Sequence, residues 1–233
     1  MAILMDHLIS WMIAIPILGI GILAFFRDEE SIRRIALGVT MVEVLLSLIL
    51  YRSFDLSLQG MQFVERVQWM PTFNIQYAVG VDGISILMVM LTVLLCPLCV
   101  LCSWTGIKTR VRAFLSLILL VEGAMIVVFT ALDLFLFFML WELTMIPMYF
   151  MIILWGGPNR LAAGLKFVLY SLAGSLLLLI GILGVYLNGG NTYDLLVLTE
   201  HTYSSSTQSW LFLAFFLSFA IKMPMVPFHT WLP

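Results

Sequence analysis

The sequence predicts an all-α protein, a polytopic bundle of about seven transmembrane helices in which the seventh is broken by prolines. Two observations predict this fold class. The 233 residues are 63% hydrophobic and only 10% charged, with a mean hydropathy of +1.11, whereas soluble domains are about half apolar and a quarter charged. Apolar stretches of about 20 residues, the length that crosses a bilayer, recur along the chain. No alternating strand pattern competes with them.

The candidate membrane spans are residues 7–26, 35–51, 83–104, 113–131, 134–155, 162–187 and 209–232. The first stretch is read as a spanning helix because it lacks the basic region and the cleavage site of a signal peptide. The second stretch is short. The connection 52–82 is long enough to hold a short hairpin or an amphipathic segment.

Lys and Arg residues lie mostly in alternate connections, which gives the expected orientation. The connections after the first, third and fifth stretches hold Arg27, Arg33, Arg34, Lys108, Arg110, Arg112 and Arg160. The opposite connections hold only Arg52 and Arg66. We therefore expect the first group on the cytoplasmic side and the N-terminus outside.

Several ionisable side chains fall inside the expected spans: Glu43, Glu122, Glu142, Lys166 and Lys222. A charge at the centre of a bilayer costs at least ~2.5–3.5 kcal/mol, so such residues pair, face a protein interior or carry ions. Glu142 lies near the middle of "FLFFMLWELTMIPMYFMIILW", and Lys222 is similarly deep. We expect these two to form a buried pair that exchanges a proton when a neighbouring charge changes.

The same residues also have structural interpretations. Lys166, nearer the cytoplasmic end of its span, is able to extend to the interface. Glu43 fits a local ion pair or helix contact in a short span. Glu122 fits a neutral, hydrogen-bonded acid that joins helices.

The stretch "FAIKMPMVPFHTWLP" places Pro224 and Pro227 directly after Lys222. Proline removes a backbone donor and clashes with the preceding turn, so the helix should break here. Discontinuous helices beside an ionisable residue mark ion paths in transporters. His229 follows the break and is a candidate proton relay. The simpler alternative is a structural kink.

Cys96, Cys99 and Cys102 have a spacing found in iron–sulfur ligands. They lie in an apolar span of a sequence with only three cysteines, so we interpret them as small hydrophobic residues. No nucleotide-binding glycine motif and no metal site is expected. A net charge of −2 without a basic patch gives no reason to expect a nucleic-acid partner.

The segments "DLFLFFMLWELTMIPMYFMIILWGG" and "FLSFAIKMPMVPFHTWLP" resemble the antiporter-like membrane subunits of respiratory complex I. The segment "VGVDGISILMVMLTVLLCPLCVL" is similar to their M-type members. The resemblance implies that Glu142 and Lys222 form the proton-translocating pair of a half-channel. It implies further that Lys166 modulates this pair, that His229 follows the helix break, and that Glu122 matches an acid found in some members.

The resemblance also implies a domain organisation. Residues 1–112 would hold the first three helices with an outer loop at 52–82. Residues 113–233 would hold helices four to seven, as part of the first repeat of a larger inverted-repeat fold. The chain ends at Pro233 without a polar tail, so we expect it to be truncated.

The function implied is that of a non-redox, proton-translocating membrane-arm subunit of NADH:quinone oxidoreductase in a bacterial cytoplasmic membrane. NADH, FMN, iron–sulfur clusters and quinone are then expected in partner subunits, with no cofactor in this chain. The expected partners are other membrane-arm subunits, including L-type and N-type antiporter-like subunits. Two alternatives are a subunit of a cation/proton antiporter or of a membrane-bound hydrogenase. An alternative of another class is a structural membrane scaffold.

Overall fold

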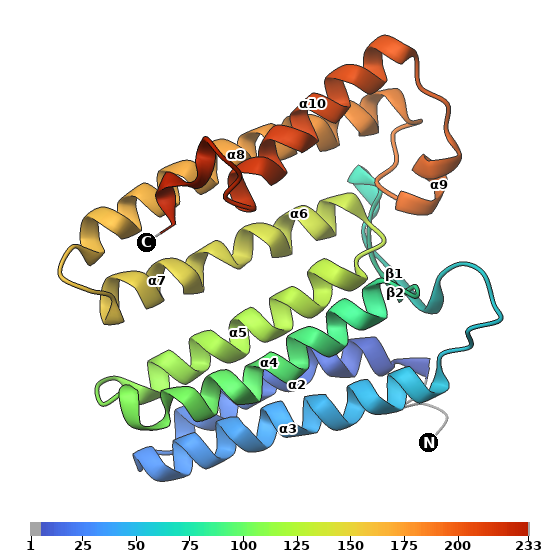
Figure 1. Ribbon diagram of the computed structural model, residues 1–233. Coiled ribbons are helices and arrows are strands. Elements are labelled where there is room, and N and C mark those ends of the chain that lie inside the picture. The colour runs from blue at the N-terminus through green and yellow to red at the C-terminus, as the bar shows by residue number, and fades with distance from the viewer. Residues whose placement is uncertain (1–5, 233) are drawn as a thin grey trace. The chain divides into compact units, whose positions relative to one another are not determined.

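The computed structural model describes residues 6–232, and this part of the chain is mostly helical (Figure 1). Residues 1–5 and Pro233, the outer ends of the two expected segments, lie outside the described residues. The chain divides into two compact units, Met1–Arg66 with Ala78–Ala131 and Val67–Tyr77 with Leu132–Pro233. The expected organisation with a boundary at residue 112 stays a prediction, since it concerns the repeats of a larger fold.

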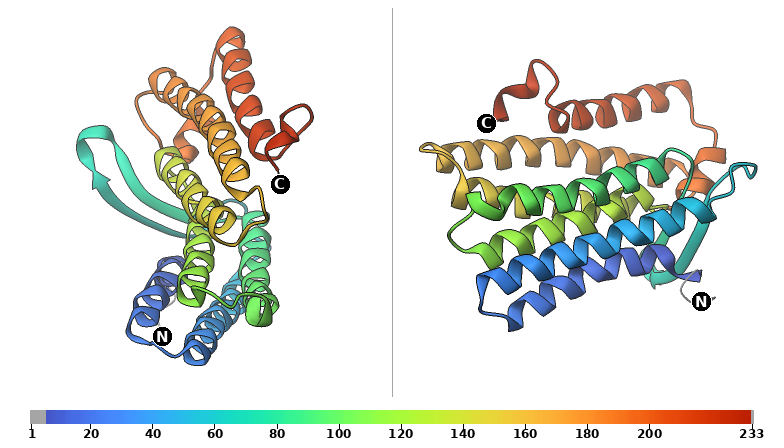
Figure 2. Two further views of the ribbon diagram at one scale, coloured as in Figure 1. Left: turned by 90° about the vertical axis from the view of Figure 1, so that its left-hand side faces the viewer. Right: turned by 60° about the horizontal axis from the view of Figure 1, so that its bottom comes forward.

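The first unit is a bundle of four long helices lying side by side (Figures 1 and 2). They are α2 (Leu8–Phe25), α3 (Glu29–Ser53), α4 (Ser85–Gly106) and α5 (Val111–Thr130). Each is long and apolar enough to cross a bilayer. α2 packs against α3 and α5, and α4 also packs against both. The predicted all-α membrane fold is therefore confirmed in this unit.

Helix α3 begins earlier than the expected span at residue 35. Asp28 caps the helix by accepting a hydrogen bond from the N–H of Ser31 at 2.8 Å. Glu30 in the first turn pairs with Arg34 at 3.0 Å. The prediction of a short helix was wrong. Hydropathy detects only the residues that lie in lipid, whereas a polar cap and side-chain pairs extend the helix into water.

The second unit contains α6 (Leu134–Leu143), α7 (Met145–Trp155), α8 (Arg160–Asn188), α9 (Leu195–Glu200) and α10 (Ser205–Lys222). Within the described residues, six helical segments of the chain are long and apolar enough to cross a bilayer, with α6 and α7 counted as one. The seventh expected span corresponds to α10. This helix starts with a polar turn and ends at Lys222, ten residues earlier than expected, because the prolines follow directly.

Helix α8 packs against α10 along a row of glycines. A Cβ added to Gly174 would lie 3.2 Å from Ile221, one on Gly181 3.3 Å from Phe215, and one on Gly184 2.7 Å from Leu211. Small residues allow membrane helices to approach closely. The close approach at Gly174 places the lysine-bearing end of α10 beside the turn of α8 that carries Ser175.

The connection between α3 and α4 holds a hairpin of β1 (Gln62–Met70) and β2 (Ile75–Val81). Figure 2 shows it as a twisted two-stranded ribbon. Asn74 follows the short turn Pro71–Phe73 with a φ of 54°, a conformation that asparagine tolerates. Its side-chain amide donates to the carbonyl of Asn191 at 3.1 Å.

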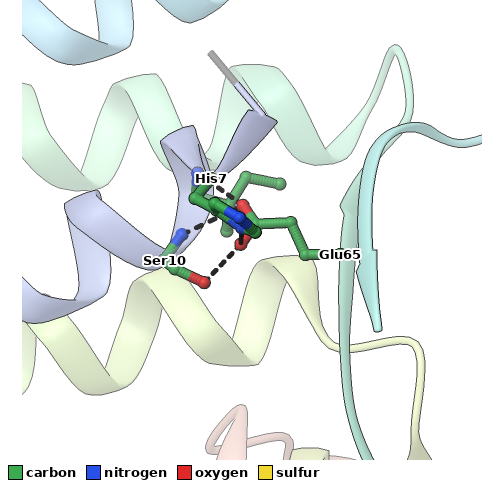
Figure 3. A network of polar contacts seen from close by, with 4 residues as sticks. His7, Ser10 and Glu65 are labelled. Carbon is green, nitrogen blue, oxygen red and sulfur yellow. Dashed lines mark hydrogen bonds and ion pairs between the residues drawn. The ribbon is translucent and has the colours of Figure 1, made fainter. Parts of the chain in front are cut away.

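A buried carboxylate joins β1 to α2 in the first unit (Figure 3). Oε1 of Glu65 accepts hydrogen bonds from the N–H groups of Ile9 and Ser10 at 3.0 and 3.1 Å. Oε2 bonds with the hydroxyl of Ser10 and lies 3.4 Å from Nδ1 of His7. The strand thereby satisfies the unpaired donors at the start of a helix that carries no cap of its own.

Candidate functional site

Glu142 lies where its membrane span is interrupted. α6 ends at Leu143 and α7 begins at Met145, because Pro147 has no N–H to donate to the carbonyl of Leu143. The Oγ1 of Thr144 donates back to the carbonyl of Trp141 at 2.7 Å. The predicted span 134–155 is confirmed as Leu134–Trp155, and Pro147 accounts for the single-residue break within it.

The carboxyl group of Glu142 meets a hydroxyl group from α8. Oγ of Ser175 forms a hydrogen bond with Oε1 of Glu142, and the same Oγ lies 2.8 Å from the carbonyl oxygen of Ser171. Glu142 is half-buried and Ser175 is buried. Sequence reasoning did not identify Ser175, because nothing in the sequence distinguishes it from Ser171, the other serine of α8.

Lys222 lies over an aromatic ring. Its Nζ is 5.1 Å from the centroid of the ring of Trp141, within the range of a cation–π interaction. Trp141 directly precedes Glu142, whose carboxylate interacts electrostatically with Lys222. No direct ion pair joins Glu142 to Lys222 in the described part of the chain. The structure therefore brings the two predicted residues into one site, without a direct contact between their charges.

The end of α10 replaces its lost backbone hydrogen bonds with a side chain. Pro224 has no N–H, and the carbonyl of Ala220 accepts instead from the N–H of Met225 at 2.9 Å. The carbonyl of Ile221 is thereby left without its helical partner and accepts from Nε1 of Trp231 at 2.7 Å. A freed carbonyl in a membrane interior needs such a partner. The break next to the lysine is thus a defined structure.

Lys166 and His229 are not brought to the pair. Lys166 is exposed on α8, about two and a half turns before Ser175 and on the opposite side of the helix. His229 is exposed in the short helix η2 (Phe228–Trp231), and no hydrogen bond or ion pair of its ring is found in the described structure. Their proposed roles stay predictions.

Glu122 belongs to the other compact unit. It is fully buried on α5, near Glu43 of α3 and Cys96 of α4. Of the three cysteines, only Cys96 is buried, while Cys99 and Cys102 are exposed. Among the described residues, no group of three or more His, Cys, Asp or Glu side chains is arranged to hold a metal ion.

Asp133 fixes the start of α6 outside the membrane span. Its Oδ1 accepts from the N–H groups of Phe135 and Leu136 at 2.9 and 3.0 Å, and its Oδ2 accepts from the N–H of Gln76 at 3.0 Å. Burial raises the pKa of Asp133, although these hydrogen bonds oppose the change. This carboxyl group therefore ties the helix that carries Glu142 to the tip of the hairpin.

Two family models match adjacent parts of the chain. Residues 11–130 match the model described as NADH-ubiquinone oxidoreductase chain 4, amino terminus. Residues 131–233 match the model described as NADH:quinone oxidoreductase/Mrp antiporter, TM. The boundary between the two models coincides with the boundary between α5 and α6.

Individual relatives agree with the models. The chain is 41% identical to NADH-ubiquinone oxidoreductase chain 4 of Arabidopsis thaliana, over 97% of this chain and 46% of that protein. It is 40% identical to NADH-quinone oxidoreductase subunit M of Rhodobacter capsulatus, over 98% and 48%. The chain spans about half the length of these relatives.

A solved structure gives the same result. A chain of respiratory complex I from Thermus thermophilus with bound NADH aligns with a TM-score of 0.82 and 32% identity, over 100% of this chain and 46% of that chain. The sequence resemblance to M-type subunits is thus confirmed. With one model matching residues 11–130 and another matching residues 131–233, the chain belongs to the family of NADH-ubiquinone oxidoreductase chain 4.

Proposed function

We propose that this chain acts as a proton-translocating, M-type membrane-arm subunit of an NADH:quinone oxidoreductase. One observation carries the proposal. Within one compact unit, Glu142 and Lys222 each stand at an interruption of their helix and interact electrostatically. Interrupted helices beside intramembrane charges are typical of ion-transporting sites.

The arrangement suits proton exchange at Lys222. While Glu142 is ionised, its negative charge stabilises the ammonium group of Lys222. When the charge of Glu142 is neutralised or compensated by another cation, the ammonium group loses this stabilisation and releases its proton to a neighbouring acceptor. Return of the carboxylate charge draws a proton back. Lys166 would supply the competing cation and His229 would relay the proton, both as predictions of the family resemblance.

The rest of the machinery is proposed to lie in partner subunits. NADH, FMN, iron–sulfur clusters and quinone would be bound there, and L-type and N-type antiporter-like subunits would be neighbours in the membrane arm. The chain itself would perform no redox step. We place it in a bacterial cytoplasmic membrane with its N-terminus outside, as the distribution of Lys and Arg predicts.

The test is NADH-driven proton pumping by inverted membrane vesicles that contain the complete complex. Glu142→Gln and Lys222→Ala should each largely abolish acidification of the vesicle interior, while a native gel shows normal assembly. The exposed residues Glu200 and Lys108 provide matched controls as Glu200→Gln and Lys108→Ala. Near-normal pumping by both pair variants would overturn the proposed role.

A second candidate is a subunit of a cation/proton antiporter. The family model that matches residues 131–233 covers both NADH:quinone oxidoreductases and Mrp antiporters. Proton movement driven by a sodium gradient without NADH would favour it. Dependence on hydrogen or formate would favour a membrane-bound hydrogenase. A scaffold would lose assembly on removal of either charge, with transport per assembled complex unchanged.

A further inference from the structure

A second pair of ionisable side chains lies inside the first unit. Glu43 is near the middle of α3 and Glu122 is near the middle of α5. Both have an exposed fraction of 0%. The two carboxyl groups are close enough to repel each other electrostatically. A site in the bundle interior is therefore formed by two acids from different helices.

No ion pair involves either acid in the described structure. None of the four carboxyl oxygens of Glu43 and Glu122 has a hydrogen-bond partner in the described structure. The thiol of Cys96 on α4 lies beside Glu122 and is at most a weak donor. Buried polar atoms without partners are rare in proteins and require an explanation.

The neighbouring helices supply no cation to the pair. α2 contains no charged or titratable residue, and the groups of α4 that interact with Glu122 are the thiols of Cys96 and Cys99. On α3, the buried guanidinium of Arg33 donates to the carbonyl oxygens of Ser103 and Ile107. The pair thus lies in the bundle interior without a cation at either acid.

Two carboxylates cannot both be ionised in such a place. Transfer of each charge out of water costs several kcal/mol or more, and the repulsion between them adds to that cost. Protonation removes both penalties and turns each acid into a donor as well as an acceptor. A neutral pair is able to share hydrogen bonds directly or through a buried water molecule.

We propose that Glu43 and Glu122 form a proton-binding carboxyl pair, which stays neutral at physiological pH and exchanges its protons with water in the assembled complex. The site is independent of the Glu142–Lys222 pair. It lies in the part of the chain that matches the chain 4 amino-terminal model, whereas the model shared with antiporters begins at residue 131.

The test is infrared difference spectroscopy of the purified, assembled complex in H2O and in D2O at neutral pH. The C=O stretch of a neutral carboxyl group is resolved from carboxylate bands and shifts when deuterium replaces the proton. Glu43→Gln and Glu122→Gln should each remove intensity from this deuterium-sensitive neutral band and none from the carboxylate bands. Glu200→Gln, at an exposed glutamate, should remove carboxylate intensity instead.

Two further variants keep an acid at the site. Glu43→Asp and Glu122→Asp should shift the neutral band instead of removing it, and they assign the band if a glutamine variant does not assemble. Loss of carboxylate intensity in a pair variant would indicate an ionised site, and a neutral band insensitive to D2O would indicate a purely structural pair. Either result overturns the proposal. Pumping by Glu142→Gln is measured separately, so that failure of the proposed function leaves this result intact.

Discussion

The carboxyl group of Glu142 is hydrogen-bonded to a neutral hydroxyl group, and the ammonium group of Lys222 rests on an aromatic ring. A direct ion pair in an apolar interior holds both charges in place, because separating it leaves an uncompensated buried charge. The looser arrangement seen here lets either residue change its charge at a smaller cost. The proton exchange that we propose requires that property.

Ser175→Ala removes the hydroxyl group that bonds with Glu142. A lost hydrogen bond to a buried group costs about 1–3 kcal/mol, so we expect NADH-driven pumping to fall by roughly tenfold. Ser171→Ala, one turn earlier, is the matched control, because it leaves the carbonyl of Ser171 in place. Equal pumping by Ser175→Ala and wild type would contradict a positioning role for this hydroxyl group.

At the level of elements, a proline causes both helix interruptions, but different side-chain hydrogen bonds stabilise the two breaks. Pro147 interrupts the span that contains α6 and α7, and Thr144 bonds back to Trp141 there. Pro224 ends α10, and the indole of Trp231 takes the place of the missing backbone donor. A proline fixes where a helix stops, whereas a side chain elsewhere decides whether the end is stable.

Trp231→Phe should therefore destabilise the end of α10. The variant keeps the aromatic contact with Phe167, whose ring centroid lies 5.4 Å away, and loses the N–H donor to Ile221. We expect a loss of about 1–3 kcal/mol in unfolding free energy, measured by thermal unfolding in detergent. Trp210→Phe, at a position that is 71% exposed, should change stability little; similar losses in both variants would argue against the capping role.

Asp133 makes the junction between α6 and the hairpin sensitive to pH. Burial raises the pKa of Asp133 above its ordinary value of 3.8, so the folded state holds this proton more tightly than the unfolded state. The resulting stabilisation is fully present below that value and is lost as pH rises through the folded-state pKa. Asp133→Asn should remove this component, as measured by thermal unfolding at a series of pH values.

Asp82 at the start of α4 provides a control of opposite sign. Hydrogen bonds from the backbone N–H and the side chain of Ser85 lower the pKa of Asp82, so its stabilisation is present above the ordinary value and is lost as pH falls through the folded-state pKa. Asp82→Asn should weaken the protein at neutral pH and flatten the acid side of the profile. The two assignments would be reversed if Asp82→Asn lost the decline in stability with rising pH while Asp133→Asn kept it.

Hydropathy predicted the helices that lipid requires, such as α2, α4 and α8, because residence in a bilayer needs about 20 apolar residues. It did not predict the start of α3, which a polar cap determines. The break at Thr144 was predictable from Pro147. The hydrogen bond of Ser175 with Glu142 and the proximity of Glu43 to Glu122 depend on which helix faces meet, and a single sequence does not specify that.

At the scale of the whole molecule, each unit gathers its basic connections at one end of its helices. In the first unit, Arg112 donates to the carbonyl of Phe26 and Arg33 to that of Ile107, which joins two connections rich in Lys and Arg. In the second unit, the backbones of Asp133 and Asp194 form an antiparallel β-bridge at the end opposite Arg160. This distribution is what a cytoplasmic location of the basic connections requires.

Labelling of single cysteines tests the orientation. In a protein whose native cysteines are replaced by serine, Lys108→Cys places a thiol in the exposed connection between α4 and α5, and Ser206→Cys places one in the exposed first turn of α10. A membrane-impermeant maleimide should label Ser206→Cys in intact cells and Lys108→Cys only in inverted vesicles. The reverse pattern would place the N-terminus in the cytoplasm.

The hydroxyl group of Ser175 has two acceptors, the carboxyl group of Glu142 and the carbonyl oxygen of Ser171, so the hydrogen bonding of α8 depends on the charge of Glu142. A hydroxyl group has one hydrogen, so it donates either to an ionised Glu142 or to the carbonyl of Ser171. A protonated Glu142 supplies its own hydrogen and leaves the carbonyl bond intact. The bond to the carbonyl of Ser171 lies in the turn of α8 where Gly174 approaches Ile221 closely. A distortion of α8 at this turn therefore changes the hydrogen bond that joins Ser175 to Glu142.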